Sequence, residues 1–489
     1  MAKLLNNTVL SDLGPTVKGP DYDRTKLTAG ILHVGVGNFH RAHMAVYLDK
    51  LFAKGLGQEW AICGAGVRPG DAAMRDKLQA QDWLTTVVEL DPTGLTAQVI
   101  GSMIDFVEVD PAVTVARMAD PTIRIVSTTI TEGGYYVDAL TGGFNRAHPD
   151  MVADAANPDA PTTVFGMILL ALRKRRDAGN PPFTVMSCDN LPENGHVAKQ
   201  TVVGLARLSD ADFADWIAAN VAFPNTMVDC ITPATSDRER ALVSEKFGIT
   251  DAAPVVCEPF RQWVLEDNFP QGRPPLEEVG AEFVADVAKY ELMKLRILNG
   301  GHAAIAYPSA LLGHHFVHDA MADPRIRDWL VALENRDVIP TLAPIPGVSF
   351  DAYRDKIVER FSNPEVGDTI PRLCFDGSNR QPKFILPTVR DALANGLSFD
   401  GLALEMALWC RYCMGVDEAG NVIAPNDDNH ADLKARATEA KTRPAAFVEN
   451  QAVFGDLGSN DVFVAAFARH LNDLYEFGVA ATLAKFVQS

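Results

Sequence analysis

The stretch GILHVGVGNFHRAH, residues 30–43, decides the fold class of this chain. ILHV is typical of a buried strand, and the residues after Gly37 are typical of a helix. Gly35 and Gly37 form a turn between them, which would leave backbone N–H groups at the helix start free to bind a dinucleotide pyrophosphate. The stretch therefore predicts the first βα unit of a dinucleotide-binding domain. We assign these residues to cofactor binding: Gly35, Val36, Gly37, Asn38, Phe39 and His40.

The glycine turn is a weak signal by itself, because His40 stands where the GxGxxG fingerprint has its third glycine. The order strand, turn, helix and second strand (WAICGAG, 60–66) strengthens it. After that strand, Asp71 is the nearest carboxylate that could bind the adenosine ribose, which predicts NAD. Arg68 could pair with a 2'-phosphate, so NADP is the less favoured alternative. Asp71 could also serve only as a carboxylate at a helix N-terminus.

Strand-like and helical runs alternate up to about residue 260, which is the signature of βαβ units. The strand-like runs are WLTTVVEL (83–90), IRIVSTTI (123–130), FTVMSCDN (183–190), TMVDCIT (226–232) and PVVCEPF (254–260). The short link DPTG predicts that 83–90 and LTAQVIGS (95–102) form an appended antiparallel hairpin. Long helical patterns follow residue 281. The expected fold is α/β, with a Rossmann-type doubly wound N-terminal domain (1–285) and a mostly α-helical C-terminal domain (286–489).

Composition excludes several classes of function. The 489 residues carry a net charge of -19, which repels nucleic acids and anionic membranes. No apolar run is long enough for a membrane span, and the N-terminus lacks the pattern of a signal peptide, so we expect a cytoplasmic protein. The seven cysteines show no disulfide framework and are expected to be reduced. The single CxxC, Cys410 to Cys413, has no second CxxC to complete a zinc site.

The stretch KLRILNGGH, residues 294–302, is unusual for a helix that serves only packing. At about 100° per residue, Glu291, Lys294, Asn299 and His302 share one side of an α-helix. The glycines at 300 and 301 each cost about 0.5 to 1 kcal/mol relative to alanine in a helix. We therefore expect that the helix bends there or that a cofactor and substrate press against its backbone. The alternative is a surface pair of Lys294 with Glu291 beside a structural histidine.

These side chains suit the oxidation of an alcohol. A lysine in an apolar pocket loses ammonium stability, so Lys294 is the candidate general base. Asparagine amides can hold a developing alkoxide, and Asn299 together with Asn190, at the end of strand 183–190, are the candidate donors. His302 could bond a substrate hydroxyl or position the lysine, or could be a structural histidine.

Seven motifs spread over nearly the whole chain resemble the polyol-specific long-chain dehydrogenases. They are GVGNFHRAH (35–43), STTITEGGYY (127–136), TVMSCDNLPENG (184–195), FPNTMVDCITP (223–233), VCEPFRQWVLED (256–267), KLRILNGGH (294–302) and PRLCFDGSNR (371–380). The resemblance implies oxidation of a secondary alcohol to a ketose with NAD and without zinc or another metal. It also implies a small-molecule polyol or ketose as substrate and a monomeric protein.

The same resemblance implies a role for each candidate residue. Lys294 falls on the family's base, Asn190 and Asn299 on its oxyanion asparagines, and His302 on its substrate-facing histidine. The residues implied for substrate binding are Asp229, Arg372 and Arg380, and those implied for relaying the proton are Glu132 and Glu291. Two positions depart from the family pattern: Cys230 replaces an arginine that usually follows the aspartate, and Arg380 stands where relatives often have lysine.

Four alternatives stay open at this point. A sugar-acid oxidoreductase of the same architecture would use Arg372 and Arg380 to clamp a carboxylate, and a D-arabinitol dehydrogenase would act on another polyol. A metal-dependent alcohol dehydrogenase is suggested by His314, His315 and His318, of which the first and last would be neighbours on a helix, although a polar helix end explains them as well. An NAD-binding sensor would keep the glycine turn and need no base.

Overall fold

The computed structural model describes residues 2–138 and 141–489. It divides into two compact units, unit 1 (Met1–Ala288) and unit 2 (Lys289–Ser489). Among the described residues, no helix has the length and apolar character needed to cross a membrane.

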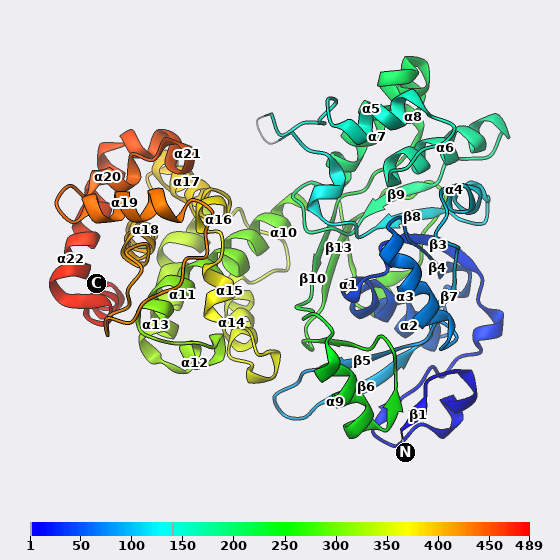
Figure 1. The fold of residues 1–489 in the computed structure, drawn as a ribbon, viewed down its shortest axis with the longest axis horizontal. Coiled ribbons are helices and arrows are strands. Elements are labelled where there is room, and N and C mark those ends of the chain that lie inside the picture. Colours follow the sequence, from blue (N-terminus) through cyan, green and yellow to red (C-terminus); the bar gives the residue numbers. More distant parts are fainter. Residues whose placement is uncertain (1, 139–140) are drawn as a thin grey trace. The chain divides into compact units, whose positions relative to one another are not determined.

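Unit 1 is built on a sheet of five parallel strands in the order β7-β4-β3-β8-β9 (Figure 1). The strands are β3 (Ala29–Val34), β4 (Ala61–Ala65), β7 (Met103–Phe106), β8 (Ile125–Thr128) and β9 (Thr184–Ser187). The first strand lies in the centre and the order reverses between β3 and β8, as in the Rossmann fold. The predicted doubly wound domain is confirmed.

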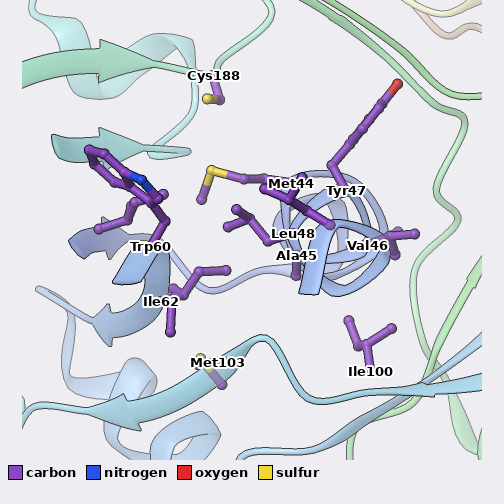
Figure 2. Close-up of a cluster of buried hydrophobic side chains, with 14 of the residues drawn as sticks. Met44, Ala45, Val46, Tyr47, Leu48, Trp60, Ile62, Ile100, Met103 and Cys188 are labelled. Carbon is purple, nitrogen blue, oxygen red and sulfur yellow. The ribbon is translucent and has the colours of Figure 1, made fainter. Parts of the chain in front are cut away.

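Helices cover both faces of this sheet, because successive side chains of each strand point to opposite sides. Ile31 packs with residues of α2 (Met44–Ala53), including Met44 and Leu48 in the cluster that Figure 2 shows. Leu32 belongs to a second cluster, which joins the strands to α4 (Pro111–Ala119), α6 (Val164–Asp177), α7 (Asn194–Ser209) and α8 (Ala211–Asn220). The strands are therefore buried on both sides, which explains their continuous apolar runs.

The predicted hairpin is also present. β5 (Thr85–Glu89) pairs antiparallel with β6 (Thr96–Ile100), and the two belong to a four-stranded sheet in the order β12-β5-β6-β2. The expectation that 226–232 and 254–260 join the parallel sheet is wrong. β10 (Thr226–Asp229) pairs antiparallel with β13 (Gln262–Glu266), and β12 (Val255–Cys257) pairs with β5. Both segments are apolar because residues of each, such as Val228 and Val255, are buried in the core of unit 1. A buried strand has the same residue pattern in either sheet.

The remaining elements of unit 1 are short. They are β1 (Lys3–Leu4), β2 (Val17–Lys18), α1 (Asn38–Ala42), α3 (Pro69–Gln79), η4 (Glu132–Tyr135), α5 (Pro149–Ala156), α9 (Asp237–Phe247), β11 (Ile249–Thr250) and β14 (Glu282–Val284), with further single turns of 3-10 helix at Asn7–Asp12, Arg24–Lys26, Gln58–Trp60 and Leu276–Val279.

Unit 2 is helical, as predicted (Figure 1). It starts within α10 (Ala288–Met293) and continues through η6 (Lys294–Asn299), α11 (Gly300–Leu311), α12 (Val317–Ala322), α13 (Pro324–Leu333), η7 (Glu334–Val338), η8 (Ile339–Thr341), α14 (Phe350–Phe361), η9 (Pro364–Val366), α15 (Ile370–Cys374), α16 (Gly377–Phe384), α17 (Leu386–Asn395), α18 (Asp400–Tyr412), α19 (His430–Ala440), α20 (Ala445–Val448), α21 (Gln451–Phe454), η10 (Gly455–Ser459) and α22 (Asp461–Gln488). η6 and η7 are π-helical, whereas η8, η9 and η10 are 3-10 helices. The aromatic core of the unit includes Trp329 and Trp409, both fully buried.

Candidate active site

The glycine turn lies at the carboxyl end of β3, next to β8. Gly35 has φ +96°, and a Cβ atom at this position would lie 2.1 Å from the carbonyl oxygen of Thr129. Only glycine permits this approach of the turn to the chain that leaves β8. A Cβ atom on Gly37 would meet nothing closer than 4.0 Å, so the space above its backbone is open. The close approach at Gly35 is the one that the fingerprint requires for the turn, and the open space at Gly37 leaves its predicted role, access to a pyrophosphate, a prediction.

The start of α1 supplies the donors for such an anion. Among the described residues, the backbone N–H groups of Asn38, Phe39 and His40 have no hydrogen-bond partner. The Asn38 side chain holds this turn in place, because its Nδ2 donates to Thr235 Oγ1 at 2.9 Å and to the Pro233 carbonyl at 3.1 Å. Free N–H groups at a helix start beside an open glycine fit the pyrophosphate of NAD.

The side chain of His40 points away from this opening. It is 1% exposed, its ring stacks on His33 with centroids 3.6 Å apart, and neither ring nitrogen has a hydrogen-bond partner among the described residues. A glycine would leave a hole here, so the imidazole fills the position of the missing third glycine. Only the backbone of His40 is placed to take part in cofactor binding.

Acid should destabilise unit 1 through this histidine pair. Burial lowers the pKa of His33 to about 3 and the pKa of His40 well below its usual value. The unfolded chain binds protons below about pH 6.5 while the folded chain does not, so stability falls as the pH drops from 6.5 towards 3, by about 1.4 kcal/mol per pH unit for each histidine. We expect the midpoint of thermal unfolding to fall between about pH 7 and 5. The fall should be shallower in His40→Leu; an equally steep fall in that variant would contradict the assignment.

Asp71 has a structural role at the start of a helix. Its Oδ2 accepts hydrogen bonds from the backbone N–H groups of Val67 at 2.8 Å and Arg68 at 2.9 Å, which caps α3. This is the alternative that the sequence left open. Asp71 still lies in the first turn of the helix that follows β4, and its contact with the cofactor ribose stays a prediction.

Asn190 and Glu132 lie beyond the carboxyl ends of neighbouring strands, β9 and β8, and both are exposed. Asp189 holds the two segments together. Its carboxylate accepts bonds from the backbone N–H groups of Ile130 at 3.0 Å and Thr131 at 2.8 Å, and from the Tyr135 hydroxyl at 2.6 Å. Sequence reasoning missed Asp189, although an acid between a buried strand and Asn190 was a signal for a residue that organises this edge.

Asp229 is the last residue of β10 and is 5% exposed. The following Cys230 lies next to Cys257, whose thiol together with burial raises the pKa of Cys230 well above its usual value. Arg261 Nη2 donates to Cys257 Sγ at 3.1 Å. A thiol thus stands where the resemblance implies an arginine, and Arg261 supplies a guanidinium close by.

The stretch 294–302 is not the regular α-helix that the sequence analysis assumed. Lys294–Asn299 form a π-helical turn, in which hydrogen bonds run from i to i+5. In an α-helix, Lys294 and Asn299 would lie about 140° apart around the axis, whereas a π turn brings positions i and i+5 to the same side. Lys294 is 8% exposed and Asn299 is partly buried. The chain therefore gives up α-helical geometry where it presents these two side chains, as functional sites often do.

The structure explains the glycine at position 301 by a contact other than the expected one with cofactor and substrate. The helical backbone does not end there, because α11 continues from Gly300 to Leu311. A Cβ atom on Gly301 would lie 2.9 Å from Glu334 Oε1, whereas one on Gly300 would meet no atom closer than 3.6 Å. The close approach is made by a side chain of unit 2 itself, so neither a bend nor a cofactor is needed to explain Gly301.

His302 lies one residue further, partly buried, and its ring stacks on Phe361 with centroids 4.0 Å apart. Burial lowers the pKa of His302 to about 3, an effect that Asp368 opposes. The ring is therefore neutral at working pH, with one nitrogen able to donate and the other able to accept a hydrogen bond. This suits a substrate hydroxyl, which has the same two capacities.

The two candidate arginines are held differently. Arg372 forms a two-point ion pair with Asp368, through Nε at 2.5 Å from Oδ1 and through Nη2 to Oδ2. Arg380 donates from Nη1 to the Leu373 carbonyl at 2.8 Å, and burial lowers its pKa. Sequence reasoning missed Asp368, whose carboxylate accepts hydrogen bonds along one edge of the Arg372 guanidinium.

The other candidates are placed as follows. Glu291 is partly buried in α10. His314 and His315 precede α12 instead of sharing a helix with His318, and His314 Nε2 bonds to Asp323 at 3.1 Å. The described part of the chain contains no group of three or more histidine, cysteine, aspartate or glutamate side chains that could hold a metal ion. All seven cysteines are free thiols, and Cys410 is buried in α18.

Comparison with known proteins covers both units. A family model for the mannitol dehydrogenase Rossmann domain matches residues 29–278, and one for the mannitol dehydrogenase C-terminal domain matches residues 286–475. The chain belongs to the mannitol dehydrogenase family. The resemblance to polyol-specific dehydrogenases, and among them to mannitol 2-dehydrogenase, is thus confirmed.

Individual members of the mannitol dehydrogenase family are similar over nearly their whole length. Mannitol 2-dehydrogenase of Cereibacter sphaeroides is 57% identical over 96% of this chain and 99% of its own. Pseudomonas fluorescens mannitol 2-dehydrogenase, solved as a ternary complex with NAD and D-mannitol, is 43% identical with a TM-score of 0.85, covering 100% of both chains. A substrate-free D-sorbitol dehydrogenase is 36% identical with a TM-score of 0.92, covering 98% of this chain and 100% of its own.

Proposed function

We propose that this protein is an NAD-dependent polyol dehydrogenase that interconverts D-mannitol and D-fructose without a metal ion, with Lys294 as general base. The observation that carries the proposal is the 57% identity to a mannitol 2-dehydrogenase along 96% of the chain. A buried lysine and an asparagine on one π turn, with a neutral histidine at the start of the next helix, are groups of the kinds that the reaction needs.

In the proposed reaction, Lys294 in its neutral form takes the proton of the C2 hydroxyl. Bound NAD would supply the hydride acceptor for C2, and the backbone N–H groups of Asn38, Phe39 and His40 beside Gly37 would hold its pyrophosphate. The amides of Asn190 and Asn299 donate to the oxygen as negative charge develops on it. His302, Asp229, Arg372 and Arg380 bond the remaining hydroxyls, and Glu291 and Glu132 carry the proton from Lys294 towards solvent.

The arrangement of Arg372 favours a neutral polyol over a sugar acid. Its guanidinium already makes a two-point ion pair with Asp368. A sugar carboxylate would have to compete with Asp368 for the same donors, and a charged carboxylate beside Asp368 would be repelled. A hydroxyl group needs only one donor or acceptor and leaves the ion pair intact.

A substrate panel tests this proposal. We expect the highest kcat/KM with D-mannitol and NAD, lower values with D-sorbitol and D-arabinitol, and weak activity with NADP. D-sorbitol belongs in the panel because a D-sorbitol dehydrogenase has a similar structure. Fast reduction of fructuronate by NADH together with negligible oxidation of D-mannitol would overturn the assignment.

Removal of metal ions should not change the activity. The described residues hold no cluster suited to a metal ion, and Lys294 makes a Lewis acid unnecessary for activating the hydroxyl. We expect the rate of D-mannitol oxidation to be the same within error after dialysis against EDTA. A loss that added zinc restores would refute the metal-free mechanism.

A further inference from the structure

Glu334 is a buried acid directly behind the candidate catalytic stretch. It is 1% exposed, and neither oxygen of its carboxyl group has a hydrogen-bond partner among the described residues. A buried polar group without a partner costs about 1 to 3 kcal/mol, so such groups are rare in folded proteins and call for an explanation.

The backbone of Gly301 explains where this side chain lies. A Cβ atom on Gly301 would be 2.9 Å from Glu334 Oε1, 3.5 Å from Leu330 and 3.6 Å from Phe361. Glu334 thus occupies the volume that a side chain at 301 would need. The same Phe361 stacks on His302, so Gly301 and His302 are packed against one wall of unit 2.

The helices that carry Glu334, α13 and η7, are in contact with the helices that carry the candidate catalytic residues, η6 and α11. Glu334 is the first residue of η7, which continues α13 and lies against η6, the turn from Lys294 to Asn299. The indole Nε1 of Trp329 in α13 donates to the Ala304 carbonyl of α11 at 3.1 Å. Two π-helical segments therefore meet around Glu334, and α13 is anchored along the helix that carries His302.

The charge state of Glu334 suits this position. Burial raises the pKa of Glu334 well above its usual value, which favours the neutral form of the carboxyl group. Arg354 opposes this effect and Asp355 supports it, and Arg354 is itself paired with Asp351 and Asp355. A neutral carboxyl group can pack against the glycine backbone without bringing a charge next to Lys294 or His302.

We propose that Glu334 is a positioning residue for catalysis: its carboxyl group packs against the backbone of Gly301 and fixes the start of α11, which presents His302, together with the π turn before it, which presents Lys294 and Asn299. The inference rests on the proposed function. Misplacing a catalytic group by about 1 Å can cost about 100-fold in rate. Contact between Glu334 and Gly301 is therefore expected to matter for turnover more than for folding.

A matched pair of glycine variants tests the contact. Gly301→Ala places a methyl group against Glu334, and we expect kcat for D-mannitol to fall at least tenfold with little change in the KM for NAD. Gly300→Ala, whose Cβ atom would have only ordinary contacts, is the control, with a loss of less than twofold. Equal kcat in the wild type and Gly301→Ala would overturn the proposal, as would equal losses in both variants.

Variants of Glu334 test whether its carboxyl group is what the methyl group of Gly301→Ala meets. Glu334→Ala removes the group that the new methyl meets, so Gly301→Ala/Glu334→Ala should turn over at least fivefold faster than Gly301→Ala alone. Glu334→Gln keeps the shape and neutrality and should keep kcat and its pH profile within about twofold. A double variant no faster than Gly301→Ala, or a Glu334→Gln variant as slow as Glu334→Ala, would contradict the assignment.

Two further readouts separate failure of this inference from failure of the proposed function. If the wild type does not oxidise D-mannitol with NAD, the proposed function fails before any variant is compared. Amide hydrogen exchange of residues 294–302 does not depend on activity, and it should be faster in Gly301→Ala than in Gly300→Ala while thermal midpoints stay close. Unchanged exchange in Gly301→Ala would refute the positioning role directly.

Discussion

Replacing Lys294 by alanine is expected to lower the turnover of D-mannitol by about 10² to 10⁴-fold, the usual contribution of a general base. The side chain is 8% exposed on a π turn, and among the described residues no other lysine is buried. The loss should fall on kcat, because proton removal belongs to the transition state.

The measurement is steady-state oxidation of D-mannitol together with a titration of NADH binding. NADH affinity should stay within about twofold of wild type, because the glycine turn that fits the cofactor lies in unit 1. Lys289→Ala is the control, since Lys289 is exposed in the preceding helix α10. Unchanged turnover in Lys294→Ala would remove this residue from the mechanism and favour an NAD-binding protein without this chemistry.

Replacing Asn190 is expected to have the second largest effect. Loss of one oxyanion donor typically costs about 10² to 10³ in kcat, and Asn190→Ala removes the amide. Asn190→Asp keeps the volume but puts a negative charge beside a developing negative charge, so it should be at least as damaging.

The same assay with both variants checks this prediction. Asn220→Ala is the control, because Asn220 is exposed at the end of α8 and its amide only donates to the Trp216 carbonyl. Combining Asn190→Ala with Asn299→Ala should cost less than the product of the separate losses, since both amides would serve one oxygen. Activity of Asn190→Asp near the wild-type level would contradict the oxyanion role.

Much of the fold could be predicted because its signals are local. The stretch 30–43 contains a strand, a turn and a helix start, and each has its own residue pattern. The link DPTG is short enough that the strands on either side had to pair as a hairpin. The sheet to which β10 and β12 belong could not be predicted, because pairing between distant strands leaves no trace in the periodicity of either one.

Within the candidate site, residue types could be predicted better than geometry. Lys294, Asn299 and His302 stand out because polar groups interrupt an apolar helix. The π turn could not be predicted, because π-helices make up well under about 1% of residues and no spacing of residue types in a sequence marks them reliably. Asp189 and Glu334 were missed because each acts through a partner distant in sequence, and only folding brings those pairs together. Asp368 lies four residues before Arg372, a spacing that the sequence does show.

The central claim is that the neutral amine of Lys294 takes the proton from the substrate hydroxyl. The most direct test is the pH dependence of kcat/KM for D-mannitol oxidation at saturating NAD, in the wild type and in Lys294→Ala. The account predicts that the wild-type rate falls about tenfold per pH unit on the acid side as the base becomes protonated, and that this limb is absent from the residual activity of the variant. The same acid limb in both proteins would contradict the account, because another group would then be the base.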